Sequence, residues 1–201
     1  MTDARPAGNY YDKYQTRNPI ARYLMGNFLR AFDDLVARVP PGDAFEIGCG
    51  EGELSIRLAR RGFALRACDI SADIVDEARR RAAHAGVDIA FETAPIEALA
   101  GAPGAPLVVC CEVLEHLDDP EAGLDVLAGL ARPYLIASVP REPIWRALNM
   151  ARGKYWSDLG NTPGHLQHWS RGAFVKFLER RFRVVERRSP LPWTMALCEV
   201  R

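Results

Sequence analysis

Hydrophobic side chains recur at helical spacing between Ile20 and Val39, at positions that fall on one face of a helix. The sequence Pro-Pro-Gly at 40–42 then interrupts this pattern, as expected where a helix has ended. The pattern therefore predicts a helix over residues 21–38 that packs beside the rest of the fold.

From residue 43 onwards, short apolar runs alternate with amphipathic stretches, which predicts alternating strands and helices. After a first strand that ends near residue 47, the expected strands are 64–69, 87–91, 107–111, 134–139, 182–188 and 193–200. The expected helices are 54–61, 71–85, 119–131 and 171–181. Residues 140–164 carry several prolines and glycines without a regular pattern, which is typical of a long functional loop.

This order of elements points to the α/β class. Strand–helix alternation followed by two consecutive strands implies a parallel sheet that ends in an antiparallel hairpin. The run Leu107–Cys111 is apolar throughout, as in a central strand that helices cover on both faces. With 201 residues, of which 48% are hydrophobic, the chain can bury one substantial core.

A glycine-rich segment joins the first strand to its helix. Gly48, Gly50 and Gly52 occupy alternate positions in the sequence Phe45–Gly52. Glycines let the backbone turn tightly and let a ligand approach the main chain. The helix that follows offers backbone N–H groups that have no partner within the helix. This loop is therefore the first candidate binding site.

Two acidic residues limit the ligand that such a loop can bind. Glu46 precedes the first glycine by two residues, and Asp69 ends the next strand. The spacing G-x-G-x-G differs from the dinucleotide fingerprint G-x-G-x-x-G, and a carboxylate at Glu46 repels a pyrophosphate but suits a cationic amine. A carboxylate at Asp69 can accept hydrogen bonds from ribose hydroxyls. The expected ligand has a ribose and an ammonium group.

The segment Glu46–Gly52, Asp69 and the run Cys111–Leu117 together resemble the class I S-adenosylmethionine-dependent methyltransferases over residues 43–201. The resemblance implies a Rossmann-like seven-stranded, mostly parallel sheet of order 3-2-1-4-5-7-6, with strand 7 antiparallel and helices on both faces. It also implies S-adenosyl-L-methionine as the cofactor. The implied cofactor contacts are Tyr14, Arg17, Glu46, Gly48, Cys49, Gly50, Gly52, Asp69, Ile70, Pro95, Ile96, Cys111 and Glu112.

The resemblance also divides the chain by role. Residues 1–42 are expected to be an N-terminal helical lid or cap segment, and residues 43–201 the methyltransferase domain. Within that domain, residues 140–169 are expected to be an insertion that covers the substrate. Tyr14 and Arg17 have two interpretations, since they could anchor the terminus to the surface or close over the methionine carboxylate.

The composition of the chain argues against nucleic acid and membranes as binding partners. The formal net charge is zero, so no global field attracts nucleic acid or an anionic membrane. Arg79, Arg80 and Arg81 favour a solvated helix face over a nucleic-acid patch. The sequence shows no signal peptide or transmembrane span. The five cysteines lack C-x-x-C spacing, which favours reduced, buried thiols in a cytoplasmic protein.

A second group of candidate residues follows the fourth strand. Glu112, Glu115 and His116 are spaced to lie on one side of a helical turn. Carboxylates and an imidazole can bind a divalent cation such as Mg²⁺ or Mn²⁺. The run Glu-x-x-Glu-His resembles those of ubiquinone-biosynthesis O-methyltransferases and small-RNA 2′-O-methyltransferases. In the latter a distant histidine completes the metal site, and His165 matches it better than His168.

A metal-free interpretation stays open. Glu112 could support the cofactor, His116 could be a buried core residue, and His165 could act as a general base because its ordinary pKa lies near 6.5. Under either interpretation the candidate catalytic residues are His165, His116 and Glu112. The expected function is methyl transfer to a hydroxyl, in preference to an amine, of a small molecule. The alternatives are RNA 2′-O-methylation and a non-catalytic S-adenosylmethionine-binding protein.

Overall fold

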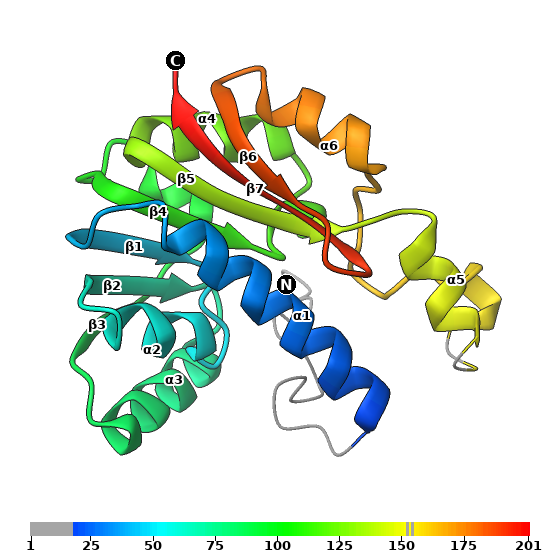
Figure 1. The fold of residues 1–201 in the computed structure, drawn as a ribbon, viewed down its shortest axis with the longest axis horizontal. Helices are drawn as coiled ribbons and strands as arrows, with labels where there is room; N and C mark the ends of the chain where they lie inside the picture. The colour runs from blue at the N-terminus through cyan, green and yellow to red at the C-terminus, as the bar shows by residue number, and fades with distance from the viewer. Residues whose placement is uncertain (1–17, 152, 154) are drawn as a thin grey trace, which may run out of the picture.

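The computed structural model describes residues 18–151, 153 and 155–201 (Figure 1). The predicted lid residues Tyr14 and Arg17 therefore lie outside the described residues. None of the helices in the described part of the chain is long and apolar enough to cross a membrane.

Seven strands form one sheet in the order β3-β2-β1-β4-β5-β7-β6. Strand β7 runs antiparallel to β5 and β6, and the remaining neighbours are parallel. The strands are β1 (Asp43–Ile47), β2 (Ala64–Asp69), β3 (Ile89–Thr93), β4 (Ala105–Cys111), β5 (Ala131–Pro140), β6 (Phe182–Arg188) and β7 (Trp193–Val200). The expected strand order and the reversed seventh strand are confirmed.

Six α-helices flank this sheet in the described part of the chain. They are α1 (Pro19–Val36), α2 (Glu53–Ala59), α3 (Ala72–Ala85), α4 (Pro120–Leu130), α5 (Ile144–Ala151) and α6 (Arg171–Leu178). Short 3-10 helices are η1 (Ile96–Leu99), η2 (Leu114–His116) and η3 (Trp156–Asp158). Side chains of Asn18, Asp119 and Ser170 accept hydrogen bonds from backbone N–H groups at the starts of α1, α4 and α6, which stabilises those helix ends.

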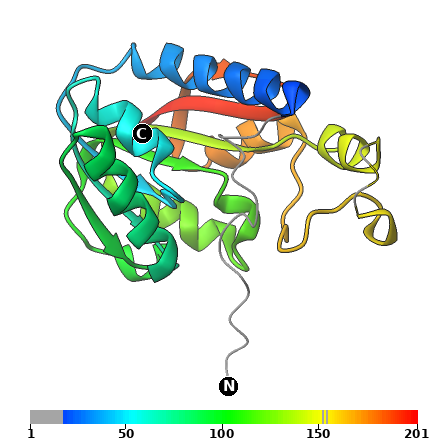
Figure 2. The same ribbon diagram turned by 90° about the horizontal axis from the view of Figure 1, so that it is seen from below.

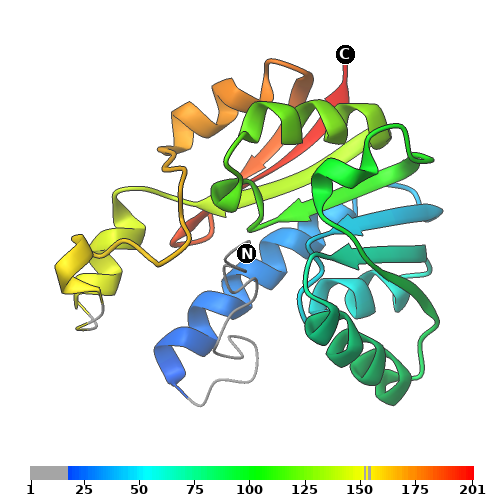
Figure 3. The ribbon, with the colours of Figure 1, turned by 180° about the vertical axis from the view of Figure 1, so that it is seen from behind.

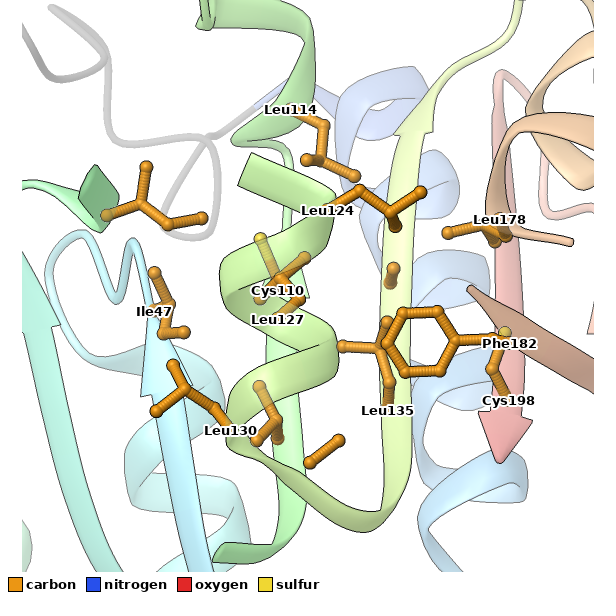
Figure 4. Packing of buried hydrophobic residues seen from close by; sticks show 14 of the residues in the cluster. Ile47, Cys110, Leu114, Leu124, Leu127, Leu130, Leu135, Leu178, Phe182 and Cys198 are labelled. Carbon is orange, nitrogen blue, oxygen red and sulfur yellow. The ribbon is translucent and has the colours of Figure 1, made fainter. Parts of the chain in front are cut away.

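Each face of the sheet carries its own hydrophobic core. On one face, Phe28 and Phe32 of α1 pack in the same cluster as Leu54 and Leu58 of α2. On the other face, α4 covers β4 and β5 and α6 covers β6 and β7, as seen from behind in Figure 3. Figure 4 shows this second cluster, in which Leu127 of α4 packs with residues such as Leu135 and Phe182. Burial on both faces explains why the central strand β4 is apolar throughout.

Two of the differences between the expected elements and the structure have a local cause. Strand β3 begins at Ile89 and not at Val87, because Gly86 is left-handed and the Val87 N–H donates to the carbonyl oxygen of Ala82, 3.1 Å away, to close the end of α3. The segment 140–164 was expected to lack regular structure, but it contains α5. This helix follows Pro143, which suits a first helical turn, and α5 projects beyond the carboxyl ends of the parallel strands (Figures 1 and 2).

Candidate active site

The glycine loop lies between β1 and α2, and its three glycines have different surroundings. All three adopt left-handed φ angles: 74° at Gly48, 52° at Gly50 and 83° at Gly52. A Cβ atom on Gly48 would lie 2.2 Å from a methyl carbon of Val113, and one on Gly52 would lie 3.2 Å from the Cβ of Ala78. A Cβ on Gly50 would meet no atom of the described residues within 4 Å. Gly48 and Gly52 therefore allow close packing, whereas Gly50 borders open space that a ligand can enter.

Asp69 ends β2 beside this loop. Its Oδ2 accepts a hydrogen bond of 3.0 Å from the Gly50 N–H, and its Oδ1 accepts one of 3.1 Å from the Ser71 N–H. Ser71 occupies the N-cap position of α3, and its side chain makes no capping hydrogen bond within the described residues. Asp69 thus links the glycine loop to the start of α3. The next residue, Ile70, is 58% exposed and offers an apolar surface next to the carboxylate.

Glu46 lies within β1 and is buried, with 2% of its surface exposed. Burial raises the pKa of Glu46 to about 8, although the Ser55 hydroxyl donates a hydrogen bond that lowers it. The nearby Asp69 carboxylate contributes further to the rise. A cation next to Glu46 would favour the ionised carboxylate. This acid is therefore suited to an ammonium group.

Besides Glu46, three of the expected cofactor contacts have buried side chains. Cys49, Ile96 and Cys111 are 6%, 4% and 8% exposed. Ile96 packs into the core beneath α4, and Cys111 packs into the cluster that contains α1. Pro95 is exposed at the start of η1. Burial raises the pKa of the Cys49 thiol well above its ordinary range, so this thiol is not a nucleophile. The backbone is the part of these three buried residues that remains suited to a ligand.

Glu112 follows β4 in a left-handed conformation, with a φ of 60°. Its Oε1 accepts a hydrogen bond of 2.9 Å from the Ser138 hydroxyl, and its Oε2 accepts one of 2.6 Å from the Trp193 indole N–H. The side chain therefore links the end of β4 to β5 and β7. The sequence did not single out Ser138 or Trp193, because they lie 26 and 81 residues away along the chain.

Glu115, His116 and His165 form a compact cluster. One potential ligand atom of each lies within 4.8 Å of those of the other two. Glu115 and His165 are buried, with 1% and 8% of their surfaces exposed, whereas His116 is exposed. Glu112, expected as a fourth ligand, does not belong to this cluster of described residues. The reason is that η2 begins at Leu114, so Glu112 precedes the turn that carries the other two residues.

The loop after η3 brings His165 to this cluster. The N–H groups of Leu166 and Gln167 donate to the carbonyl oxygen of Glu115, at 2.8 and 3.0 Å. The carbonyl oxygen of Gly164 accepts a hydrogen bond from Nδ1 of His116, 2.9 Å away. A proton on Nδ1 leaves Nε2 as the ring nitrogen with the lone pair, which is the form that can bind a metal or accept a proton. His168 lies outside the cluster and hydrogen-bonds to Asn161.

Comparison with known sequences gives the same class of domain. Residues 44–133 match a family model described as a methyltransferase domain. The chain is 32% identical over 165 residues to the ubiquinone biosynthesis O-methyltransferase of Cupriavidus pinatubonensis, covering 74% of this chain and 66% of that protein. It is 30% identical over 160 residues to the protein of that name from Xylella fastidiosa, covering 70% and 64%. The chain thus spans slightly less than two thirds of the length of these curated relatives.

Solved structures share the fold at lower identity. Magnesium protoporphyrin IX methyltransferase from Synechocystis PCC 6803, with bound SAH, superimposes with a TM-score of 0.73 at 22% identity, covering 94% of this chain and 91% of that one. The N-methyltransferase NodS from Bradyrhizobium japonicum superimposes with a TM-score of 0.68 at 17% identity, covering 89% and 97%. At these identities the likeness shows a common fold.

Proposed function

The chain belongs to the class I S-adenosylmethionine-dependent methyltransferases, and on this premise we propose that it methylates a hydroxyl, in preference to an amine, of a small-molecule acceptor. The observation that carries this proposal is the cluster of Glu115, His116 and His165. Glu115 and His116 of this cluster lie just after β4, and β4 is the neighbour of β1, the strand that leads into the glycine loop. Groups suited to an acceptor therefore lie at the same edge of the sheet as groups suited to the cofactor, where open α/β sheets bind ligands.

The proposed transfer breaks the bond between the sulfonium sulfur and its methyl carbon and forms a bond from that carbon to the acceptor oxygen. The sulfonium becomes a neutral thioether, and the hydroxyl proton must leave. His165, buried in the cluster, can accept this proton as a general base when the substrate hydroxyl lies within hydrogen-bond reach of its imidazole. Because the cofactor is already activated, the protein contributes mainly by alignment and by exclusion of water.

A divalent cation fits the cluster. Glu115, His116 and His165 offer one carboxylate and two imidazoles within 4.8 Å of one another. Two imidazoles suit Mn²⁺, Zn²⁺ or Fe²⁺ better than Mg²⁺, which prefers oxygen ligands. A bound cation would lower the pKa of the acceptor hydroxyls. The metal-free alternative, in which His165 acts as a general base, uses the same residues.

Methyl transfer to a small molecule is favoured over RNA methylation by the surface charges. The side chain of Arg79 pairs with Asp76 at 2.7 Å, and those of Arg80 and Arg81 each pair with Glu77 at 2.7 Å. The arginine cluster of α3 is therefore partly neutralised by carboxylates on its own helix. The relatives named above are O-methyltransferases by name, which supports a hydroxyl acceptor. The five free, buried cysteines fit the proposed cytoplasmic location.

A transfer assay with methyl-labelled S-adenosylmethionine tests this proposal. The acceptor probes are 3,4-dihydroxybenzoate, an aromatic amine of similar size and a short RNA. We expect label in the dihydroxybenzoate, and a loss of transfer in His165→Ala with little change in cofactor affinity. Cofactor binding without transfer to any probe would favour the non-catalytic alternative. An excess of chelator separates the two mechanisms, since full activity with no metal by elemental analysis would contradict the metal.

A further inference from the structure

Helix α5 makes specific hydrogen bonds to the loop that carries His165. Trp145 and Asn149 lie one turn apart on this helix, so they share a face. The Trp145 indole N–H donates to the Thr162 hydroxyl oxygen at 2.9 Å, and the Asn149 amide donates to the same oxygen at 3.1 Å. Asn149 is 1% exposed, and its amide also donates to the carbonyl oxygen of Gly160 at 2.9 Å. Thr162 is thus the shared acceptor of two side chains from α5.

These contacts continue to His165. The carbonyl oxygen of Thr162 accepts a hydrogen bond of 3.0 Å from the His165 N–H. The Trp145 ring stacks on the His165 imidazole, with centroids 5.8 Å apart and planes at 29°. The His116 ring meets the same imidazole edge-on, with centroids 4.9 Å apart. The position of this imidazole therefore depends on α5 as well as on η2, the turn that carries His116.

The backbone approach between α5 and the loop is close. Gly160 has a φ of 77°, and a Cβ atom there would lie 2.2 Å from the carbonyl oxygen of Arg146. The Arg146 side chain donates to the carbonyl oxygen of Leu159 at 3.1 Å. Because packed atoms cannot interpenetrate, a shift of α5 would also move the residues of the loop that packs against it.

We propose that Thr162, Asn149 and Trp145 are positioning residues that hold the His165 imidazole in the orientation that the reaction needs. The role of His165 in that reaction rests on the proposed function, whereas the positioning itself does not. Thr162 is the critical member of the three. Valine at 162 has nearly the same shape but accepts no hydrogen bond, so two donors from α5 lose their acceptor in a largely buried site. The loop must then move to satisfy them.

The direct test is nuclear magnetic resonance of the histidine rings. The chain has four histidines, and the signals that disappear in His165→Ala identify those of His165. We expect Thr162→Val to shift the ring signals of His165, and Thr162→Ser, which restores the hydroxyl, to return them to those of the unmodified protein. Thr194→Val is the matched control, since Thr194 is fully buried in β7 and its hydroxyl has no hydrogen-bond partner among the described residues.

Two outcomes would overturn the proposal. One is a Thr162→Val protein whose His165 signals superimpose on those of the unmodified protein, and the other is a Thr194→Val control that shifts them equally. If Thr162→Val does not fold, Trp145→Phe serves instead. It keeps a stacked ring but removes the indole N–H, and unchanged His165 signals would again contradict the proposal.

Turnover with 3,4-dihydroxybenzoate then links position to function. We expect Thr162→Val to lower kcat by about tenfold or more without changing the cofactor Kd, because misplacement of a catalytic group has effects of this size. In a His165→Ala background the same change should cause no further loss, since coupled residues are not additive. Equal losses in both backgrounds would mean that Thr162 acts on turnover independently of His165. Full activity of His165→Ala itself would contradict the proposed function. The resonance test would still show whether Thr162 holds the His165 imidazole in place.

Discussion

Nδ1 of His116 lies 2.9 Å from the carbonyl oxygen of Gly164, and this contact joins two segments 48 residues apart. Gly164 has a φ of 87°, and a Cβ atom there would lie 3.5 Å from the same nitrogen. The left-handed backbone therefore presents the carbonyl oxygen to the imidazole. This single bond fixes Nδ1 as the nitrogen that carries the proton in the neutral imidazole of His116, and it also connects the turn after β4 to the loop that carries His165.

The glycine loop gives a matched pair of substitutions. Gly48→Ala should lower the free energy of unfolding by roughly 2–5 kcal/mol, because it combines a left-handed alanine with a clash against Val113. Gly50→Ala should cost about 1–2 kcal/mol, since its methyl meets open space. Gly50→Ala should instead weaken cofactor binding by about tenfold or more. Denaturant unfolding and calorimetry check both, and equal effects on stability would contradict the different surroundings of the two glycines.

Asp69→Ala should weaken cofactor binding by about 1.5–3 kcal/mol, because it removes a charge-assisted acceptor for the ribose hydroxyls. The same change frees the Gly50 and Ser71 N–H groups, so the loop loses part of its support. Asp69→Asn, which keeps the size of the side chain and one acceptor oxygen, should have a smaller effect. Isothermal titration calorimetry measures both affinities. An unchanged affinity in Asp69→Ala would mean that another acid binds the ribose.

Glu46 makes stability depend on pH. Its folded-state pKa of about 8 exceeds the ordinary value of 4.5, so the folded protein binds more protons than the unfolded chain between these values. The free energy of unfolding should therefore fall as the pH rises from about 4.5 to about 8. The contribution is fully present below 4.5 and is lost above 8. Glu46→Gln should flatten this part of the profile in thermal unfolding, and an unaltered slope would argue against the shift.

The same acid predicts a pH dependence of cofactor binding. If the ammonium group of the cofactor pairs with the Glu46 carboxylate, then binding below pH 8 must release a proton from this residue. Affinity should rise with pH up to about 8, and calorimetry in buffers of different ionisation enthalpy should detect the released proton. Glu53→Gln is the control, since it alters a neighbouring charge and leaves the buried acid in place. Proton release that persists in Glu46→Gln would assign it to another group.

Glu112 and Glu115 should respond differently to the same substitution. If the cluster binds Mn²⁺, as the metal mechanism requires, Glu115→Gln should lower the affinity for Mn²⁺ by about tenfold or more, because it removes the carboxylate of the cluster. Glu112→Gln should retain Mn²⁺ but lower the free energy of unfolding by about 1–3 kcal/mol, since the Ser138 and Trp193 donors lose a charged acceptor. Elemental analysis after dialysis and thermal unfolding measure the two effects. Loss of Mn²⁺ from the Glu112→Gln protein would instead indicate that Glu112 is a metal ligand.

Deletion of residues 1–17 tests the lid that the sequence predicts. Asn18 caps α1 by accepting hydrogen bonds from the N–H groups of Ile20 and Ala21, at 2.9 and 3.3 Å. A chain that begins at Asn18 therefore keeps its first helix, and its melting temperature should change little. Cofactor affinity or turnover should fall. Full activity of the truncated protein would contradict the lid and favour the other interpretation, in which this segment only anchors the terminus to the surface.

The limits of β2, β6 and β7 agree at both ends with those expected from the sequence, because turn residues or helix ends flank each of these strands. The glycine loop and Asp69 were also identified from sequence. The glycine loop and Asp69 can bind a ligand because each directly follows or ends a parallel strand, at the edge of the sheet where ligands bind. The order of strands and helices along the chain is enough to predict this position. The strand order itself came from the family resemblance, since no local pattern specifies which strands become neighbours.

The direction of Glu112 and the support of His165 were decided by the tertiary structure. Glu112 lies in the same short run as Glu115, yet its carboxylate is held by Ser138 and Trp193 from two other strands. Helix α5 was missed because it lies in a segment whose prolines and glycines hide its helical pattern, and its hydrogen bonds to Thr162 join residues that are 13 and 17 positions apart along the chain. Side-chain direction depends on partners that are distant in sequence, whereas strand limits and the glycine turn depend on neighbouring residues. The sequence by itself therefore determined which residues gather at this edge of the sheet, and the tertiary packing decided which of them face one another.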